Sequence, residues 1–171
     1  MRQKLLMTII FVFIIFLNVK TGASEMENQS KYAYKILEIS LNGGILLSNK
    51  QTVHLAGINS ESLNSELIVF LKSIAKGKYC LFVQDKVLSN GFGYVYLVDY
   101  DESKLPVGIE NKSPYIMAYR NIYLDSWPFP KKIYKGISYN LNIILIKKGN
   151  LRVDRNRNFE LISEFEKYEA S

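Results

Sequence analysis

An amphipathic helix between two groups of short strands constrains the fold of this chain more than any other feature. Its apolar side chains recur at helical spacing, and Gly77 ends the run. Ser62 is predicted as its N-cap, because a serine hydroxyl accepts a hydrogen bond from the first turn. Such a stripe has to be buried, and the neighbouring strands provide the surface for it. The stripe consists of Leu63, Leu67, Phe70, Leu71 and Ile74.

Strands are predicted on both sides of this helix. Three precede it, over about residues 34–40, 45–47 and 52–58, and two follow it, over about 79–84 and 93–99. The first two are joined by Asn42-Gly43-Gly44, residue types that tolerate the positive φ of tight turns. Five strands with a helix after the third are typical of an OB-fold barrel. The predicted fold class is therefore α+β, a five-stranded OB-fold barrel with about two to four helices.

The first 24 residues are predicted to be a separate unit. Arg2 and Lys4 precede an apolar run from Leu5 to Leu17, and small residues follow at 22–24. This pattern predicts a secretory signal peptide, with an uncleaved N-terminal anchor as the alternative. The protein is thus expected to be exported, either periplasmic, extracellular or anchored to the membrane. Residues 25–171 then form a single domain.

An aromatic insertion is predicted after the fifth strand, over about residues 102–138. Ser113-Pro114 suits a helix start, because proline is favoured at the first helical position. Prolines at 128 and 130 prevent that helix from continuing. We therefore expect a short helix followed by an extended aromatic lid. The aromatic residues of the insertion include Tyr115, Tyr119, Tyr123, Trp127 and Phe129.

Five segments of the chain resemble the staphylococcal nuclease (thermonuclease) family, and they follow one another in the order that the family has. The resemblance covers about residues 33–101 and resumes at about residue 139. Its most informative part is the strand and turn Val53-His54-Leu55-Ala56-Gly57-Ile58-Asn59-Ser60-Glu61. The other parts are Tyr34–Ile39, Lys78–Val83, Asn90–Leu97 and Asn140–Gly149.

The resemblance implies calcium-dependent phosphodiester cleavage, but this chain departs from the family at every catalytic position. Carboxylates bind the calcium ion, two arginines stabilise charge on phosphorus, and a glutamate acts on the attacking water. The metal positions hold Gly44 and Asn59, the arginine positions His54 and Asn90, and the glutamate position Ser62. Losing one such donor lowers a rate about 10²–10³-fold. The chain is therefore predicted to be catalytically inactive, with no metal and no cofactor.

An alternative keeps the enzymatic activity. Glu61 lies next to the lost glutamate position, and Glu38 or Asp85 could join it in a rearranged active site. The chain would then be a calcium-dependent endonuclease, with Ca²⁺ as its cofactor.

Charge and aromatic residues indicate a binding role instead. Three basic residues and no acids precede Ser24, which leaves 19 basic against 16 acidic side chains, a net charge of only +3. The basic residues concentrate between Lys131 and Arg157, where they suit phosphates, although a solvated face paired with the acidic tail has the same pattern.

The aromatic residues also suit a binding surface. OB-folds bind single strands on aromatic platforms, although the same rings could serve packing. The expected partner is single-stranded nucleic acid or an extracytoplasmic protein. The predicted binding residues are Tyr94, Tyr96, Tyr115, Tyr119, Trp127, Lys147, Lys148 and Arg152.

Overall fold

The computed structural model describes residues 32–89, 91–98, 116–125, 131–149 and 151–169. Its strands are β1 (Tyr32–Ile39), β2 (Ile45–Leu47), β3 (Thr52–Leu55), β4 (Tyr79–Gln84), β5 (Phe92–Val98), β6 (Ile116–Leu124) and β7 (Lys131–Asn140). Its helices are the 3₁₀ helix η1 (Ser60–Ser62), α2 (Ser65–Ala75), α3 (Leu141–Gly149) and α4 (Ile162–Glu166).

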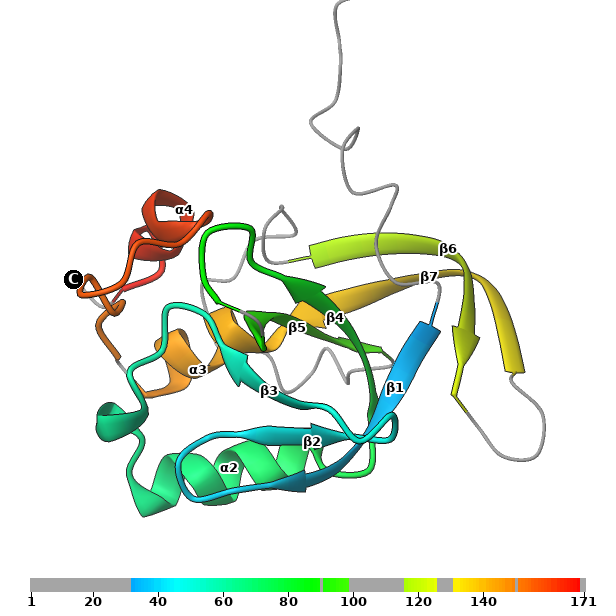
Figure 1. Cartoon of the computed structure of the whole chain (residues 1–171), viewed down its shortest axis with the longest axis horizontal. Coiled ribbons are helices and arrows are strands. Elements are labelled where there is room, and N and C mark those ends of the chain that lie inside the picture. Colours follow the sequence, from blue (N-terminus) through cyan, green and yellow to red (C-terminus); the bar gives the residue numbers. More distant parts are fainter. Residues whose placement is uncertain (1–31, 90, 99–115, 126–130, 150, 170–171) are drawn as a thin grey trace, which may run out of the picture.

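The first five strands close into a barrel. Each strand pairs with the next in the order β1, β2, β3, β5, β4 and back to β1, and only the β3–β5 pair is parallel (Figure 1). The first half of β1 pairs with β4 and the second half with β2, with a shift of register between Ile36 and Glu38. Such an irregularity bends a strand and lets it serve both sides of a small barrel. The predicted α+β class with an OB-fold-like barrel is confirmed.

The helix after the third strand is also confirmed, but its start differs from the prediction. Asn64 is the N-cap, because its side-chain oxygen accepts a hydrogen bond of 2.9 Å from the backbone N–H of Leu67. Ser62 instead ends the short helix η1. The buried face of α2, made by Leu67, Ile68, Leu71, Ile74 and Ala75, belongs to the main core.

The insertion contains strands where a helix was predicted. β6 and β7 pair antiparallel, and together they form a long ribbon to one side of the barrel (Figure 1). This ribbon is joined to the barrel on both sides. β6 pairs parallel with β1, with Tyr123 opposite Tyr32, and β7 pairs antiparallel with β5, with Tyr139 opposite Leu97. The predicted helix is therefore wrong over residues 116–123. The lid predicted at residues 127–130 and the helix start at 113–114 lie outside the described residues.

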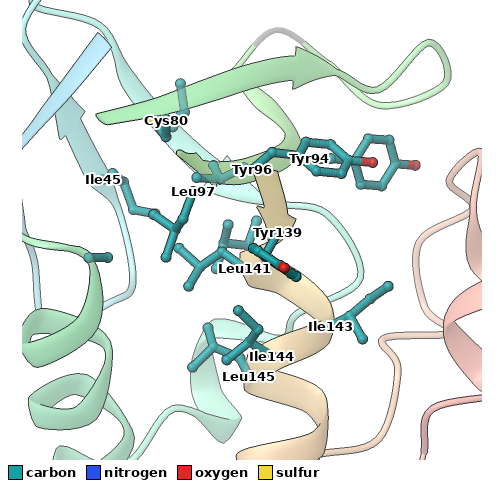
Figure 2. Packing of buried hydrophobic residues seen from close by; sticks show 14 of the residues in the cluster. Ile45, Cys80, Tyr94, Tyr96, Leu97, Tyr139, Leu141, Ile143, Ile144 and Leu145 are labelled. Atoms are coloured by element: carbon teal, nitrogen blue, oxygen red, sulfur yellow. The ribbon is translucent and has the colours of Figure 1, made fainter. Parts of the chain in front are cut away.

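Helix α3 follows β7 directly and packs against β5 and α2. Its first six residues are all buried, and their apolar side chains lie against those of the strands (Figure 2). Asn142 is buried among them, because its amide group donates to the carbonyls of Ala56 and Gly93 and accepts from the N–H of Val95. This side chain ties β3 and β5 to the helix, which fixes the part of the barrel where the candidate site lies.

Candidate functional site

A cavity of about 150 Å³ opens where β3, the turn after β1, η1 and the C-terminal segment meet. Its walls are partly apolar, with Leu55, Ile58 and Leu63, and partly polar. The polar and aromatic lining residues are Asn42, His54, Asn59, Ser60, Phe92 and Arg157, and Gly43 completes the wall.

The cationic side of the cavity is built around one aromatic ring. The parallel pairing of β3 with β5 places His54 beside Phe92, and their rings stack with centroids 5.1 Å apart. The guanidinium of Arg157 lies over the same ring, with its Cζ 4.9 Å from the centroid. Stacking on an aromatic face holds a guanidinium plane in place while its N–H groups stay available at the edge.

The turn after β1 is tightly packed with side chains around Gly44. The side-chain carbonyl oxygen of Asn42 accepts hydrogen bonds from the Ser40 hydroxyl and from the backbone N–H of Gly44, and these bonds close the turn. A Cβ atom at Gly44 would lie 2.9 Å from the Ser40 Oγ and 3.3 Å from the His54 Cε1. The side chains of Ser40 and His54 would therefore have to shift to admit an aspartate at position 44.

The polar residues of the next turn serve local structure. The Asn59 side chain accepts a 3.0 Å hydrogen bond from the N–H of Glu61, and the Ser62 hydroxyl donates to the Asn59 carbonyl at 2.6 Å. These bonds cap η1. Of the five degenerate family positions, His54 and Asn59 line the cavity and Gly44 lies against His54, whereas Ser62 is not among the lining residues. Asn90, the fifth, lies outside the described residues.

The carboxylates proposed for a rearranged active site do not line the cavity. Glu61 is exposed. Glu38 forms ion pairs with Lys76 at 2.5 Å and Lys72 at 3.8 Å, and the hydrogen bond from Lys76 is the main reason its pKa is lowered. Asp85 is buried among backbone and tyrosine donors. Within the described part of the chain, no group of three histidine, cysteine or acidic side chains could hold a metal ion.

The predicted aromatic surface on β5 is wrong. Tyr94 and Tyr96 are each only 1% exposed, so their rings belong to the core (Figure 2) and cannot stack on a ligand. Burial raises the pKa of Tyr96 to about 12. Tyr119 is part of β6, and its predicted binding role stays a prediction. Tyr115 and Trp127 lie outside the described residues, so their predicted binding role stays a prediction.

The predicted basic cluster is spread over several elements. Lys131 begins the ten-residue strand β7, which extends for about 30 Å, whereas Lys147 is near the end of helix α3. Lys147 and Lys148 are in the last turn of α3, where the Lys148 ammonium lies 5.5 Å from the ring of Phe70. Arg152 is exposed on the C-terminal segment. None of these three lines the cavity, and their role in binding also stays a prediction.

Two residues at the centre of the site were not singled out in the sequence. Arg157 was one member of the basic cluster, and Phe92 stood just before a predicted strand, without a role. The parallel register of β3 and β5 brings Phe92 beside His54, and no local pattern in either strand encodes that register.

Comparison with family models, with curated proteins and with solved structures finds no match to this chain. The resemblance to the nuclease family therefore rests on the motifs of the sequence. None of the described helices has the length and apolar character needed to cross a bilayer.

The electrostatics of the cavity favour an anion. Its walls contain one guanidinium and one imidazole, and among the described residues that line it there is no carboxylate. Calcium requires several oxygen ligands, with carboxylates to balance its charge, whereas phosphate is bound by guanidinium and amide N–H groups. The described part of the lining therefore offers more to an anionic group than to a calcium ion.

Proposed function

We propose that this protein is an exported, non-hydrolytic relative of the staphylococcal nuclease family that binds single-stranded nucleic acid. The observation that carries the proposal is the cavity beside β3 and β5, where Arg157 and His54 flank Phe92 and none of the described lining residues is a carboxylate. A guanidinium held on an aromatic ring suits one phosphate. Cleavage is not expected, because the oxygen ligands for calcium and the second arginine have no counterpart in the lining.

The size of the cavity suits one small group of a nucleotide, such as a phosphate or a single ring. A cavity of about 150 Å³ is comparable to one that accommodates a benzene ring. Leu55, Ile58 and Leu63 offer apolar contact to the uncharged part of such a group. A single strand can present one such group to the cavity and leave the rest of the chain outside, on the surface where OB-folds commonly bind single strands.

The proposal is tested with the full chain and a fluorescently labelled oligothymidylate. We expect binding, followed by anisotropy, whose affinity falls as salt is raised. Arg157→Ala should lower the affinity about tenfold, because a charge-assisted contact to phosphate is lost. Arg155→Ala is the matched control, since Arg155 is on the same segment but pairs with Glu166 and Glu169.

Cleavage of the oligonucleotide is followed in the same samples, with and without Ca²⁺. We expect none. Calcium-dependent cleavage that disappears in Glu61→Gln would replace the proposal with the rearranged nuclease. Absence of any binding would overturn nucleic acid as the ligand and leave an extracytoplasmic protein as the partner to be tested.

A further inference from the structure

The segment from Leu151 to Leu161 brings Arg157 to the cavity, although it belongs to no strand of the barrel. Leu151 and Val153 are buried before the arginine, and Phe159 is buried after it. Arg157 itself is held only weakly within the segment, since its Nε lies 3.9 Å from the Asp154 carboxylate and half of its side chain is exposed. The position of the guanidinium therefore depends on how the segment is attached to the barrel.

Asp85 provides the main polar attachment. It directly follows β4 and is only 1% exposed, yet its carboxylate is fully engaged. One oxygen accepts from the N–H groups of Val87 and Leu88, both at 2.8 Å. The other accepts from the Tyr94 hydroxyl and, at 2.8 Å, from the N–H of Glu160 in the C-terminal segment.

Tyr94 provides a second attachment from the same place. Its hydroxyl oxygen accepts a 3.1 Å hydrogen bond from the N–H of Leu161, the residue after Glu160. Two successive backbone groups of the segment are thus held by buried side chains of the barrel. Tyr94 is two residues from Phe92 on β5, so one strand carries both the ring below Arg157 and the hydroxyl that holds the segment.

Gly57 accommodates the segment on the side of β3. Its φ is +76°, and a Cβ there would lie 2.7 Å from the Phe159 ring and 2.9 Å from the Phe165 ring. Its carbonyl accepts a 3.0 Å hydrogen bond from the N–H of Asp154. The segment is therefore attached on both sides of Arg157.

We infer that Asp85 is a positioning residue of the ligand site, which together with the Tyr94 hydroxyl holds the C-terminal segment so that Arg157 stays over Phe92. The ligand assignment in this inference rests on the proposed function. A segment released from Asp85 and Tyr94 would still carry its charge, but the guanidinium would no longer be fixed at the cavity. Affinity for phosphate would then fall although no residue that touches the ligand has changed.

Tyr94→Phe is the most selective test, because it removes the hydroxyl and keeps the buried ring. We expect the full-chain variant to remain folded by circular dichroism and to bind oligothymidylate about tenfold more weakly. Its salt slope should fall by about 0.7, the value for one lost phosphate contact on a single strand. Tyr94→Phe combined with Arg157→Ala should be no weaker than Arg157→Ala alone, because both changes remove the same contact. Asp85→Ala should behave in the same way if it folds.

Lys86→Ala is the control, because it removes only the exposed 3.1 Å ion pair between Lys86 and Glu160. The salt slope should stay close to that of the unaltered chain, because Lys86 is not one of the residues that line the cavity. A folded Tyr94→Phe protein with unchanged affinity and salt slope would overturn the inference, as would additive losses in the double variant.

Limited trypsin digestion tests the attachment without any ligand. Cleavage after Arg157, measured by mass spectrometry as the peptide that begins at Asn158, should be about tenfold faster in Tyr94→Phe than in the unaltered chain, because proteolysis follows the population of the open form. An equal rate would overturn the inference. If the unaltered chain binds no nucleic acid, the proposed function fails, and the digestion rate alone then decides whether Asp85 and Tyr94 hold the segment.

Discussion

The cavity and the Asp85 cluster use charge in opposite ways, although Phe92 and Tyr94 place them only two residues apart on β5. The Asp85 cluster comprises Asp85, the Tyr94 hydroxyl and the N–H groups of Glu160 and Leu161. There a buried carboxylate is surrounded by donors. In the cavity, Arg157 lies at the surface of the molecule, and the lining, as far as the structure describes it, contains no carboxylate.

This difference shows what each charge does. A buried carboxylate is tolerated only where hydrogen bonds replace the lost water, and such an anion has no lone pairs left for a metal ion. Burial opposes its ionisation, but the donors, with Tyr94 first, outweigh burial and hold the pKa of Asp85 below its ordinary value. The anion therefore serves the fold, and the exposed cation remains for the ligand.

The largest effect is expected when the anion of the Asp85 cluster is removed. Asp85→Ala leaves a tyrosine hydroxyl and three backbone N–H groups without their acceptor, which should lower the free energy of unfolding at pH 7 by about 3 kcal/mol. Because the pKa of Asp85 is lowered in the folded state, its contribution is present above the unfolded value of about 3.9 and is lost as the pH falls through the folded value.

Urea denaturation at pH 7 and at pH 3 checks both parts of this prediction. The difference in unfolding free energy between Asp85→Ala and the unaltered chain should shrink at pH 3. A difference that is equally large at both values would mean that the ionised form of Asp85 is not what stabilises the cluster.

A smaller loss is expected when a carboxylate is returned to the cavity. Gly44→Asp places a Cβ 2.9 Å from the Ser40 Oγ and 3.3 Å from the His54 ring, so unfolding free energy should fall by about 1–3 kcal/mol. Combining it with Asn59→Asp should still produce no calcium binding by isothermal titration calorimetry. Ser62→Glu is the control: it removes one exposed hydrogen bond, from the Ser62 hydroxyl to the Asn59 carbonyl, and should cost less than about 1 kcal/mol. Micromolar calcium binding by the double variant would show that the frame still holds a metal site.

Arg157→Lys separates charge from geometry at the cavity. Lysine keeps the positive charge but has neither the planar fork nor the stacking on Phe92. We expect the affinity for oligothymidylate to fall about threefold while the salt slope stays unchanged, both measured by anisotropy. A salt slope as low as that of Arg157→Ala would indicate that the lysine does not reach the phosphate at all.

The smallest effect is expected for Glu61→Gln. Glu61 is exposed, is not a lining residue and uses only its backbone N–H, which bonds to Asn59. Binding should therefore remain within twofold of the unaltered chain in the anisotropy titration. A large loss of affinity would show that the Glu61 carboxylate takes part in binding.

The barrel could be predicted because its signals are local. Alternating apolar residues in β1, the Asn42-Gly43-Gly44 turn and the stripe of α2 each specify an element within a few residues. The ribbon could not be predicted in the same way. Tyr119 and Tyr123 are spaced as on a helix, but tyrosine and isoleucine also favour strands, and the pairing of β6 with β1 joins residues about ninety positions apart.

The location of the site in the fold could be predicted from the sequence, but not most of the residues that build it. The family motif led to His54 and Asn59, which do line the cavity. The tyrosines of β5 were assigned to the wrong side, because every residue from Gly93 to Val98 is buried and alternation gives no outward face. Arg157 reaches the cavity through the Asp85 cluster, and contacts that link residues 85 and 160 leave no mark on either local sequence.

The most direct test of the central claim uses His54, the only histidine in the chain. Its ring C–H signals in an NMR spectrum report on the cavity without any label. Titration with a short oligothymidylate should shift these signals, whereas millimolar CaCl₂ should leave them unchanged. Calcium-induced shifts of His54, with no response to the oligonucleotide, would contradict the account and identify the cavity as a metal site.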